Sequence, residues 1–592
     1  MSGFYGVLKK NELEHSEEEI DDKDNPLQLF CLTENNQIEP RSFMESRFQV
    51  ALYGDLYNER TLRATLENKG YQFEGDTAEE VLATLFLESG KEAFKLLRGM
   101  YAFVIWDAKD ETLYAVRDPF GIKPFYYMET DEEIIFSTEK QIITELSPNL
   151  TLHEEALQHY FSFQYVPTPM TLAKEITSLE PGHFFIKQLP NPLQKHAYFQ
   201  ANFVPVDGNE QQIINRIQEV MIDSVKAHIQ GEAAVGSLLS GGIDSSLIVA
   251  LAKDVNPAIK TFSVGFEEEG YTEVPIAQQT ALELGVENIS YIIKPQEYVD
   301  ILPTIVRYLG EPLADPSCVP LYFAAKLASE HTKVVLSGEG ADELFGGYNI
   351  YREYQSLKFF HHLSPALLNG LHKLSRVIPI GWVGKSFLER GTTPLNERYI
   401  GNAKIFEEKE KQLFLKTYHP SNRYRNITED LFQRVHDEHP THQMQYVDIH
   451  TWLPGDILLK AEHMTKAHGI ELRTPFLDKE VFDVASKIPV AYKIADKQTK
   501  VILRKAAMDF VPSDVVNRKK LGFPVPIRSW LKNELYDWAY ETMQESETDC
   551  LLDKAYCLKL LTDHAKGSRD NARRVWTILM FMLWHQIFIE NE

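Results

Sequence analysis

Apolar and polar residues follow strand-like and helix-like patterns through the middle of the chain. Residues 259–266 and 289–293 alternate as half-buried strands do, and Phe262, Val264 and Phe266 share one face of the first stretch. The stretch from Val274 to Gly285 has helical spacing, so the order strand, helix, strand is predicted. Such a unit implies an α/β fold with a parallel sheet, whose ligand binds at the carboxyl ends of the strands.

A Gly-rich turn joins a further strand-like run to a helix-like run. Residues 233–239 read as the strand, 247–251 read as the helix, and Ser240-Gly241-Gly242-Ile243-Asp244-Ser245 stands between them. Two glycines let the backbone approach an anion, and the hydroxyls and helix N–H groups can donate to phosphate oxygens. This predicts a phosphate loop, although the G-x-x-x-x-G-K-[ST] pattern is missing. The alternative is a Ser/Gly turn that only caps a helix.

A second strand-like run also leads into a Gly-rich loop. Residues 334–336 are apolar, and Ser337-Gly338-Glu339-Gly340-Ala341-Asp342-Glu343 comes directly after them. Acidic residues beside a phosphate loop would repel a nucleotide unless a cation lies between them. Mg²⁺ takes oxygen ligands and shares them with phosphates, so a site for Mg²⁺ and ATP is predicted. The alternative is a solvated acidic turn.

Together these two loops resemble the synthetase domain of the glutamine-dependent (class B) asparagine synthetase family. Four further blocks agree with that family, with Thr474 where an apolar residue is usual: residues 311–317, 469–478, 499–505 and 518–523. The resemblance extends from about Asn209 to the C-terminus. It implies an ATP-pyrophosphatase-like domain, of the adenine nucleotide α-hydrolase type, with a helical C-terminal region.

The resemblance also implies a reaction and roles for named residues. A carboxylate attacks the α-phosphorus of ATP, pyrophosphate leaves, and nitrogen then attacks the acyl-adenylate. Lys500 would offset charge on the phosphates and Glu339 would help to deprotonate the nitrogen, while Asp244 and Asp342 would hold Mg²⁺. The nucleotide would be bound by Leu239, Ser240, Gly241, Gly242, Asp244, Ser245, Val264, Ser337 and Gly338. The alternatives are that Lys500 is a solvated helix lysine, that Glu339 is only an acidic residue of a loop, and that Val264 is a core valine.

The N-terminal part resembles the glutaminase domain of the same family, an αββα sandwich of the Ntn-hydrolase type. The resemblance lies in residues 97–107 and 117–127. That chemistry needs an N-terminal cysteine, whose thiolate attacks glutamine while the free α-amino group acts as base. Here Ser2 stands in its place, and a hydroxyl is a far weaker nucleophile than a thiol near neutral pH.

Other parts of the glutaminase pattern are altered as well. The H-R-G-P-D and R-L-x-I-x-D segments have no counterpart, and an acidic stretch from Glu12 to Asp24, expected to be a solvated loop, replaces them. The family's N-G-E is Tyr53-Gly54-Asp55, so the oxyanion-hole amide is lost. Cys31 is internal and cannot supply an α-amino base. We expect an inactive glutaminase, with residues 98–107 and 117–127 retained for packing.

The nitrogen must then come from another source. Free ammonia is one option, which gives an ammonia-dependent enzyme with aspartate as its default carboxylate. An amine on a larger substrate is another. Lasso-peptide macrolactam synthetases join a peptide-borne side-chain carboxylate to a peptide N-terminus, and β-lactam-forming synthetases are a similar case. A catalytically silent scaffold is the third, and it would show no ATP–pyrophosphate exchange.

Composition fits a cytoplasmic enzyme. The 592 residues are ample for two domains, predicted at 1–202 and 209–592 with a polar linker near 202–212. The net charge of −25 argues against nucleic acid or an anionic membrane as a partner. Four cysteines give no disulfide framework, and no signal peptide is evident. Residues 575–589 are too short and polar to span a bilayer, so a buried helix is expected. Dimers are common in the family, which leaves a homodimer open.

Overall fold

The fold was analysed in a computed structural model of the chain. It describes residues 3–9, 26–32, 37–38, 40–147, 149–232, 234–378, 384–495, 498–519, 522 and 524–590. Ser2 and the acidic stretch from Glu12 to Asp24, which the sequence predicts to be a solvated loop, lie outside these residues.

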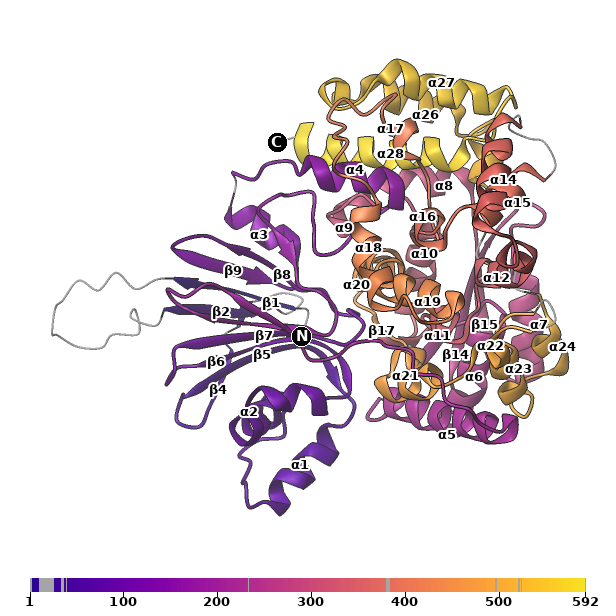
Figure 1. The fold of residues 1–592 in the computed structure, drawn as a ribbon. Helices are drawn as coiled ribbons and strands as arrows, with labels where there is room; N and C mark the ends of the chain where they lie inside the picture. The colour runs from indigo at the N-terminus through magenta and orange to yellow at the C-terminus, as the bar shows by residue number, and fades with distance from the viewer. Residues whose placement is uncertain are drawn as a thin grey trace.

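Two antiparallel sheets of six strands each stack face to face in the N-terminal part (Figure 1). The first sheet has the order β10 (Thr177–Ser178), β8 (Tyr126–Glu129), β9 (Glu133–Ser137), β1 (Gly3–Lys9), β2 (Leu27–Leu32) and β3 (Gln37–Ile38). The second has the order β12 (Gln194–Ala197), β11 (His183–Gln188), β7 (Thr112–Arg117), β6 (Gly99–Asp107), β5 (Phe48–Leu56) and β4 (Arg41–Phe43).

Helices cover the outer faces of this pair of sheets. The helices α1 (Glu59–Asn68) and α2 (Ala78–Ser89) lie against the second sheet, and α3 (Lys140–Leu146) lies against the first (Figure 1). Side chains of both sheets, among them Phe4, Val104 and Phe136, form the core between them. The αββα sandwich expected from the resemblance is therefore confirmed.

A parallel sheet of five strands forms the centre of the C-terminal part. Its order is β15 (Glu287–Ile293), β14 (Lys260–Phe266), β13 (Val235–Leu238), β16 (Val334–Leu336) and β17 (Glu471–Arg473). The chain adds strands on one side of β13 and then on the other, so a topological switch point lies between β13 and β16. Ligands of open α/β sheets bind at such points, outside the carboxyl ends of the strands.

The strand and helix patterns of the sequence are confirmed around this sheet. Strands β13, β14, β15 and β16 lie where the apolar runs predict them, and the helix α7 (Val274–Leu284) joins β14 to β15. In β14 both faces are buried, because helices cover a parallel sheet on each side. The fifth strand, β17, is not predicted from the sequence, where the resemblance implies a helical C-terminal region.

Helices make up most of the remaining C-terminal part. Those around the parallel sheet include α5 (Glu210–Ile229), α6 (Ile243–Val255), α8 (Pro295–Asp300), α9 (Leu302–Leu309), α10 (Cys318–Ser329), α11 (Ala341–Phe345), α20 (Leu459–Lys466), α21 (Lys479–Ser486), α22 (Val490–Lys493), α23 (Val501–Ala507), α24 (Ser513–Asn517) and α25 (Ile527–Trp530). Others are α12 (Glu353–Ser356), α13 (Lys358–His361), α16 (Leu395–Arg398), α17 (Glu408–Lys411), α18 (Arg425–Arg434) and α19 (Pro440–His450).

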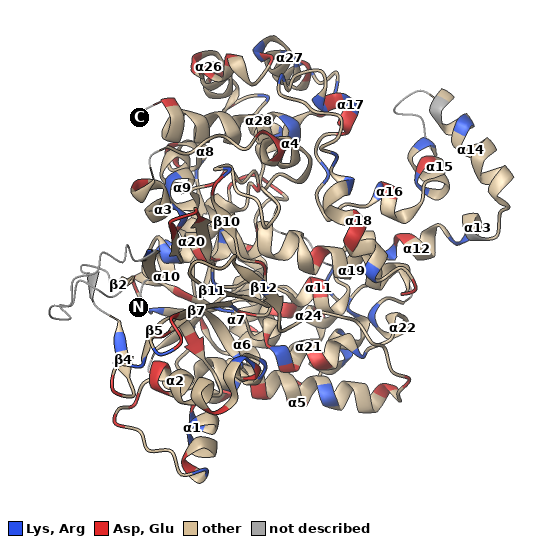
Figure 2. Ribbon diagram, turned by 60° about the vertical axis from the view of Figure 1, so that its left-hand side comes forward, with Lys and Arg blue, Asp and Glu red and all other residues tan. Residues whose placement is uncertain are grey.

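Two groups of helices form the edges of the molecule. The helices α14 (Pro365–Val377) and α15 (Lys385–Thr392) pair with each other at one edge, apart from the central sheet (Figure 2). The helices α26 (Tyr536–Glu545), α27 (Lys554–Ala565) and α28 (Ala572–His585) form a group at one end (Figure 1). Helix α28 is almost wholly buried, as the sequence predicts. Among the described residues, no helix is both long and apolar enough to cross a bilayer.

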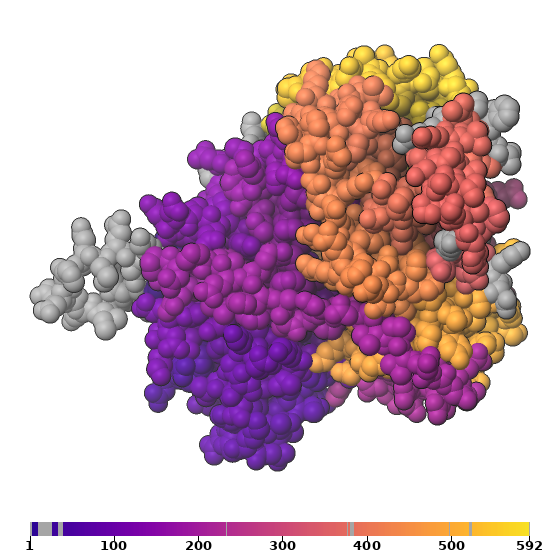
Figure 3. Space-filling view, in the orientation of Figure 1, coloured from indigo at the N-terminus to yellow at the C-terminus, as the bar shows by residue number. Residues whose placement is uncertain are grey.

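The N-terminal and C-terminal parts are packed closely against each other (Figure 3). Helix α4 (Glu154–Phe163) continues from the first part into the second, where the Tyr160 hydroxyl donates to the Thr577 carbonyl at 2.8 Å. The polar segment near 202–208 runs beside α21, because the Val204 and Val206 N–H groups donate to the carbonyls of Ser486 and Lys487. The domain limits at 202 and 209 stay a prediction.

Candidate active site

A cavity of about 470 Å³ opens at the carboxyl ends of the parallel strands. Its walls come from the loops after β13, β14 and β16 and from segments near α20 and α23. All twelve residues for which the sequence predicts a role in catalysis, nucleotide binding or metal binding line it: Leu239, Ser240, Gly241, Gly242, Asp244, Ser245, Val264, Ser337, Gly338, Glu339, Asp342 and Lys500. Their location is thus one site, while the role of each stays a prediction.

The loop after β13 is folded tightly over the start of α6. The Ser240 and Ser245 hydroxyl oxygens lie 3.2 Å apart, and the Gly242 N–H donates to Ser240 Oγ at 3.2 Å. Gly241 has a φ of 76°, a left-handed conformation that glycine adopts without strain. Arg518 donates to the Gly241 carbonyl at 2.6 Å, which holds the loop in place. The helix N-terminus and its N–H groups therefore face the cavity as an anion site would require.

The loop after β16 lies directly against this first loop. A Cβ on Gly338 would approach Asp244 Cβ to 3.1 Å and the Ser245 nitrogen to 3.3 Å, so only glycine fits without a shift. This close contact brings Asp342, at the start of α11, near Asp244, at the start of α6. Two acidic residues 98 positions apart thus face the same point because their strands are neighbours.

Lys500 lies between these two carboxylates. Its Nζ is 2.6 Å from Asp244 Oδ2 and 2.7 Å from Asp342 Oδ1, and its side chain is 2% exposed. Burial by itself would lower the pKa of Lys500, but the attraction of the two carboxylates outweighs it and the pKa lies above its usual value. The ammonium is therefore charged at neutral pH. Arg504, which also lines the cavity, adds a second cation nearby.

The same carboxylates have the chemistry of a Mg²⁺ site. Asp244 Oδ1 is buried and has no hydrogen-bond partner among the described residues, so an acceptor oxygen is left over for a cation. Within the described part of the chain, no group of three or more His, Cys, Asp or Glu residues could enclose a metal by itself. Two carboxylates that face one point suit Mg²⁺, which keeps water and phosphate oxygens as its other ligands.

A second lysine lines the cavity, and sequence reasoning missed it. Lys460 Nζ is 2.5 Å from Asp315 Oδ2 and 3.3 Å from Asp456 Oδ1. Gln164 Nε2 donates to the other Asp456 oxygen at 2.7 Å, so the cluster is hydrogen-bonded on its far side. Burial and repulsion from Asp315 raise the pKa of Asp456, which leaves Lys460 and Asp315 as the charged pair.

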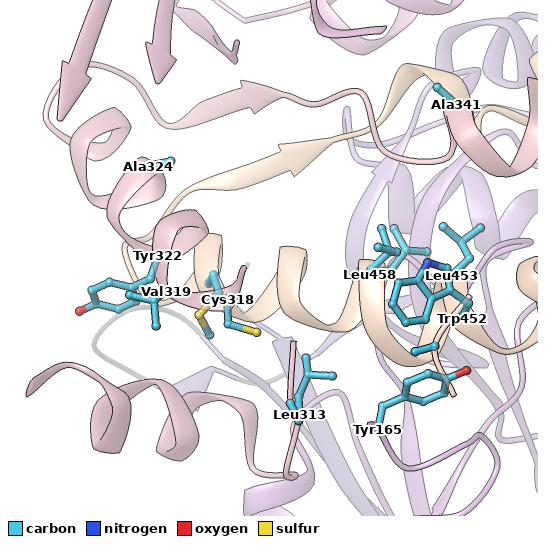
Figure 4. Packing of buried hydrophobic residues seen from close by; sticks show 14 of the residues in the cluster. Tyr165, Leu313, Cys318, Val319, Tyr322, Ala324, Ala341, Trp452, Leu453 and Leu458 are labelled. Carbon is cyan, nitrogen blue, oxygen red and sulfur yellow. The ribbon is translucent and has the colours of Figure 1, made fainter. Parts of the chain in front are cut away.

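Aromatic side chains form the wall beside Lys460. Trp452 and Tyr348 both line the cavity, and the Trp452 Nε1–H donates to the Tyr348 hydroxyl at 3.1 Å. Trp452 lies beside Tyr165, with ring centroids 6.1 Å apart (Figure 4). Tyr348 donates to Glu343 at 2.6 Å, and burial, with repulsion from Asp342, raises the pKa of Glu343 to about 8. These hydrogen bonds hold the wall in one arrangement.

In the N-terminal part, Tyr53 and Asp55 are both engaged with the C-terminal part. The Tyr53 hydroxyl donates to Glu462 of α20, which also accepts from Lys123 at 2.9 Å. Asp55 lies 2.6 Å from Arg473 of β17. These residues occupy the positions of the family's N-G-E segment, so that segment here belongs to the contact between the two parts.

Residues of the two glutaminase-like blocks make structural contacts, and that the blocks are retained for packing alone stays a prediction. Arg117 is buried and donates to the carbonyls of Lys123, Gly121 and Leu179. Asp118 accepts three backbone N–H groups of the same turn. The Arg98 guanidinium pairs with Asp478 of the C-terminal part, with 2.6 Å between Nη2 and Oδ2.

Cys31 is not placed as a nucleophile. It lies in β2 and is 2% exposed, and burial raises the pKa of its thiol to about 11. A thiol with so high a pKa carries almost no thiolate near neutral pH.

Comparison with known proteins identifies the family. The family model named asparagine synthase matches residues 216–586, and a glutamine amidotransferase domain model matches residues 32–199. The chain belongs to the asparagine synthase family. It is thus an ATP-dependent ligase that forms carbon–nitrogen bonds, with a glutamine amidotransferase-like domain before the synthetase domain.

Two relatives from Bacillus subtilis (strain 168) illustrate the range of similarity. Asparagine synthetase [glutamine-hydrolyzing] 1 is 49% identical over 95% of this chain and 89% of its own length. Asparagine synthetase [glutamine-hydrolyzing] 3 is 25% identical over 87% of this chain and 82% of its own length. The match to the amidotransferase model begins at residue 32, after the segment where the nucleophile is expected.

Proposed function

We propose that this chain makes asparagine from aspartate, ATP and free ammonia. The aspartate side-chain carboxylate attacks the α-phosphorus of ATP and pyrophosphate leaves. Ammonia then attacks the acyl-adenylate, gives up a proton and releases AMP. Among the chain's own residues, Lys500 and Arg504 would offset charge on the phosphates, and Glu339 would accept the proton. Bound Mg²⁺, held by Asp244 and Asp342, would supply further charge neutralisation.

Aspartate as substrate is supported by the charges beside the cavity. Lys460 and Asp315 form a pair of opposite charges on its wall. A free amino acid carries an α-carboxylate and an α-ammonium group, which complement such a pair. An aspartate within a peptide carries neither of these charges. It would offer Lys460 and Asp315 no complementary group, and it should therefore bind more weakly.

The observation that carries ammonia dependence is the position of Tyr53. Its hydroxyl is bonded to Glu462 and its ring lies under the Lys123 ammonium, 4.6 Å from the ring centroid. A phenol held in this way cannot act as the amide donor of an oxyanion hole. With Ser2 in place of cysteine, the nucleophile and the donor are both changed.

The test is nitrogen transfer by purified protein with Mg²⁺, ATP and aspartate. We expect asparagine and AMP in equal amounts with ¹⁵N-ammonium, and no asparagine above background with glutamine labelled at the amide. Ser2→Ala should leave the ammonium rate unchanged, since Ser2 takes no part in that reaction. Asparagine formed from glutamine, and lost in Ser2→Ala, would refute ammonia dependence. If aspartate supports no AMP release with either donor, the assignment of aspartate is wrong.

A further inference from the structure

Lys500 occupies the point where Asp244 and Asp342 would hold Mg²⁺. It touches one oxygen of each carboxylate, at 2.6 Å and 2.7 Å, and almost none of its side chain reaches solvent. The three residues come from three separate segments: the start of α6, the start of α11 and the turn before α23. Their meeting is therefore a property of the folded site, not of one local turn.

The position of the Lys500 ammonium is fixed by backbone and packing. Lys500 has a φ of 54°, a left-handed conformation that is strained for a non-glycine residue. A side chain at Gly347 would overlap both the Asp342 carboxylate and the Lys500 stem, so the glycine leaves room for both. The strained backbone aims the side chain at the two carboxylates.

Two carboxylates that face one point need a cation there. In the absence of nucleotide, the Lys500 ammonium supplies a single positive charge to both. It does not satisfy the pair fully, since Asp244 Oδ1 keeps no partner among the described residues. Lys500 and a metal held by both carboxylates would compete for the same two negative charges, because the ammonium already contacts both groups.

We propose that Lys500 is a built-in substitute for Mg²⁺, a positioning residue that holds the metal site together and keeps it closed until nucleotide arrives. Lys500 leaves the carboxylates when the phosphates of ATP offer it another set of oxygens, and the metal enters with the nucleotide. The enzyme without nucleotide therefore binds divalent cations weakly. This inference rests on the proposed function only in its assignment of the metal to Asp244 and Asp342.

Mn²⁺ binding followed by electron paramagnetic resonance tests this inference on the full-length protein. Mn²⁺ is the probe, and the nucleotide is α,β-methylene-ATP, which cannot transfer its adenylyl group to a carboxylate because its α,β-methylene bridge is not cleaved. We expect the wild type to bind Mn²⁺ weakly alone and much more tightly with the analogue. Lys500→Met should bind Mn²⁺ at least about tenfold more tightly than the wild type in the absence of nucleotide, because it removes the one cation shown in contact with both carboxylates.

Two further variants complete the experiment. Lys505→Met, in the helix α23 that follows Lys500, removes a lysine that pairs with the half-exposed Glu210, so its Mn²⁺ affinity should equal that of the wild type. Lys500→Arg keeps the charge, so it should restore weak Mn²⁺ binding without nucleotide. Restoration by arginine would not be expected if Lys500 served only to support the fold.

Each contrary result has its own meaning. Tight Mn²⁺ binding by the wild type without nucleotide, or equal affinities in the wild type and Lys500→Met, would overturn the inference and leave the proposed reaction intact. If the analogue induces no Mn²⁺ binding in the wild type, the metal assignment itself is wrong and the inference falls with it. Should Lys500→Met not fold, the wild type with and without analogue decides alone, by the ratio of its two affinities.

Discussion

At the residue scale, Lys460 is the cavity residue whose role the sequence conceals best. In the sequence it comes after Asp456 at the i+4 spacing of an ordinary surface ion pair on a helix. In the structure Lys460 is 6% exposed and faces the cavity. The carboxylate nearest to its ammonium is that of Asp315, which is 145 positions away in the sequence. A contact of that kind depends on packing between elements, which no local pattern encodes.

Replacement of Lys460 by methionine should weaken aspartate binding selectively. The change removes the cation proposed for the α-carboxylate and leaves Asp315 buried without its counter-charge. We expect the KM for aspartate to rise by at least about tenfold, with a much smaller change for ATP. Lys466→Met is the matched control, because Lys466 lies on the same helix but pairs with Glu139 of the N-terminal part. Steady-state kinetics measure both KM values. A larger rise in the KM for ATP than in the KM for aspartate would contradict the proposed role of Lys460.

Other residues show how far the sequence alone reaches. Ser240, Asp244, Glu339 and Asp342 could be located in advance because each stands within a few residues of a strand end, in a loop with a recognisable pattern. Tyr53 could be recognised only as a departure from the family. Its hydrogen bond to Glu462 joins residues 409 positions apart, so the contact that the tyrosine makes is visible only in the fold.

At the element scale, the loops after β13 and β16 were predictable and the turn before α20 was not. Residues 453–458 form a π-helical turn, which contains Pro454 and lies between Trp452 and Lys460. Proline cannot donate a helix hydrogen bond, and the wider turn shifts the register of the helical residues after it. Apolar periodicity carries no signal for such a turn. The same holds for β17, whose three residues are too few to show alternation.

The loop between α11 and the 3₁₀ turn after it should not tolerate a side chain at Gly347. An added Cβ would overlap the Asp342 carboxylate and the Lys500 stem, and so push the charged cluster apart. We expect Gly347→Ala to slow AMP formation by about 100-fold, the usual cost of displacing reacting groups by an ångström. Gly370→Ala is the control, because nothing lies within 4 Å of its added Cβ. It should keep full activity and raise helix stability by up to about 1 kcal/mol. Equal activities of the two variants would show that the cluster adapts.

At the scale of the whole molecule, buried charges join the two parts. Arg473 contacts Asp55 at 2.6 Å, Lys123 contacts Glu462 at 2.9 Å, and both cations are nearly inaccessible. Such pairs are costly to break one partner at a time, since the remaining charge stays buried. The amidotransferase-like part is therefore held as a fixed neighbour of the synthetase part, whatever its own activity.

His228 makes this contact sensitive to acid. Its ring lies 4.1 Å from that of Tyr57, and burial lowers the pKa of His228 to about 4. The neighbouring Arg473 and Arg98 cations also oppose its protonation, while Asp478 favours it. A histidine in the unfolded chain titrates near pH 6.5. Between about pH 6.5 and 4, this histidine is therefore protonated in the unfolded chain and neutral in the folded chain. The contribution of neutral His228 to stability is complete above pH 6.5 and is lost as the pH falls.

His228→Gln should therefore reduce the acid sensitivity of the fold. Between pH 6 and 4.5 the free energy of unfolding of the wild type should fall relative to that of the variant by about 1.4 kcal/mol per pH unit, the slope of one proton. Urea unfolding curves at a series of pH values measure the difference, and comparison with the variant cancels the titration of every other group. His436→Gln, at an exposed position, should behave as the wild type does throughout. Parallel curves for the wild type and His228→Gln would mean that this histidine is protonated in the folded molecule and that the contact between the two parts accommodates its charge.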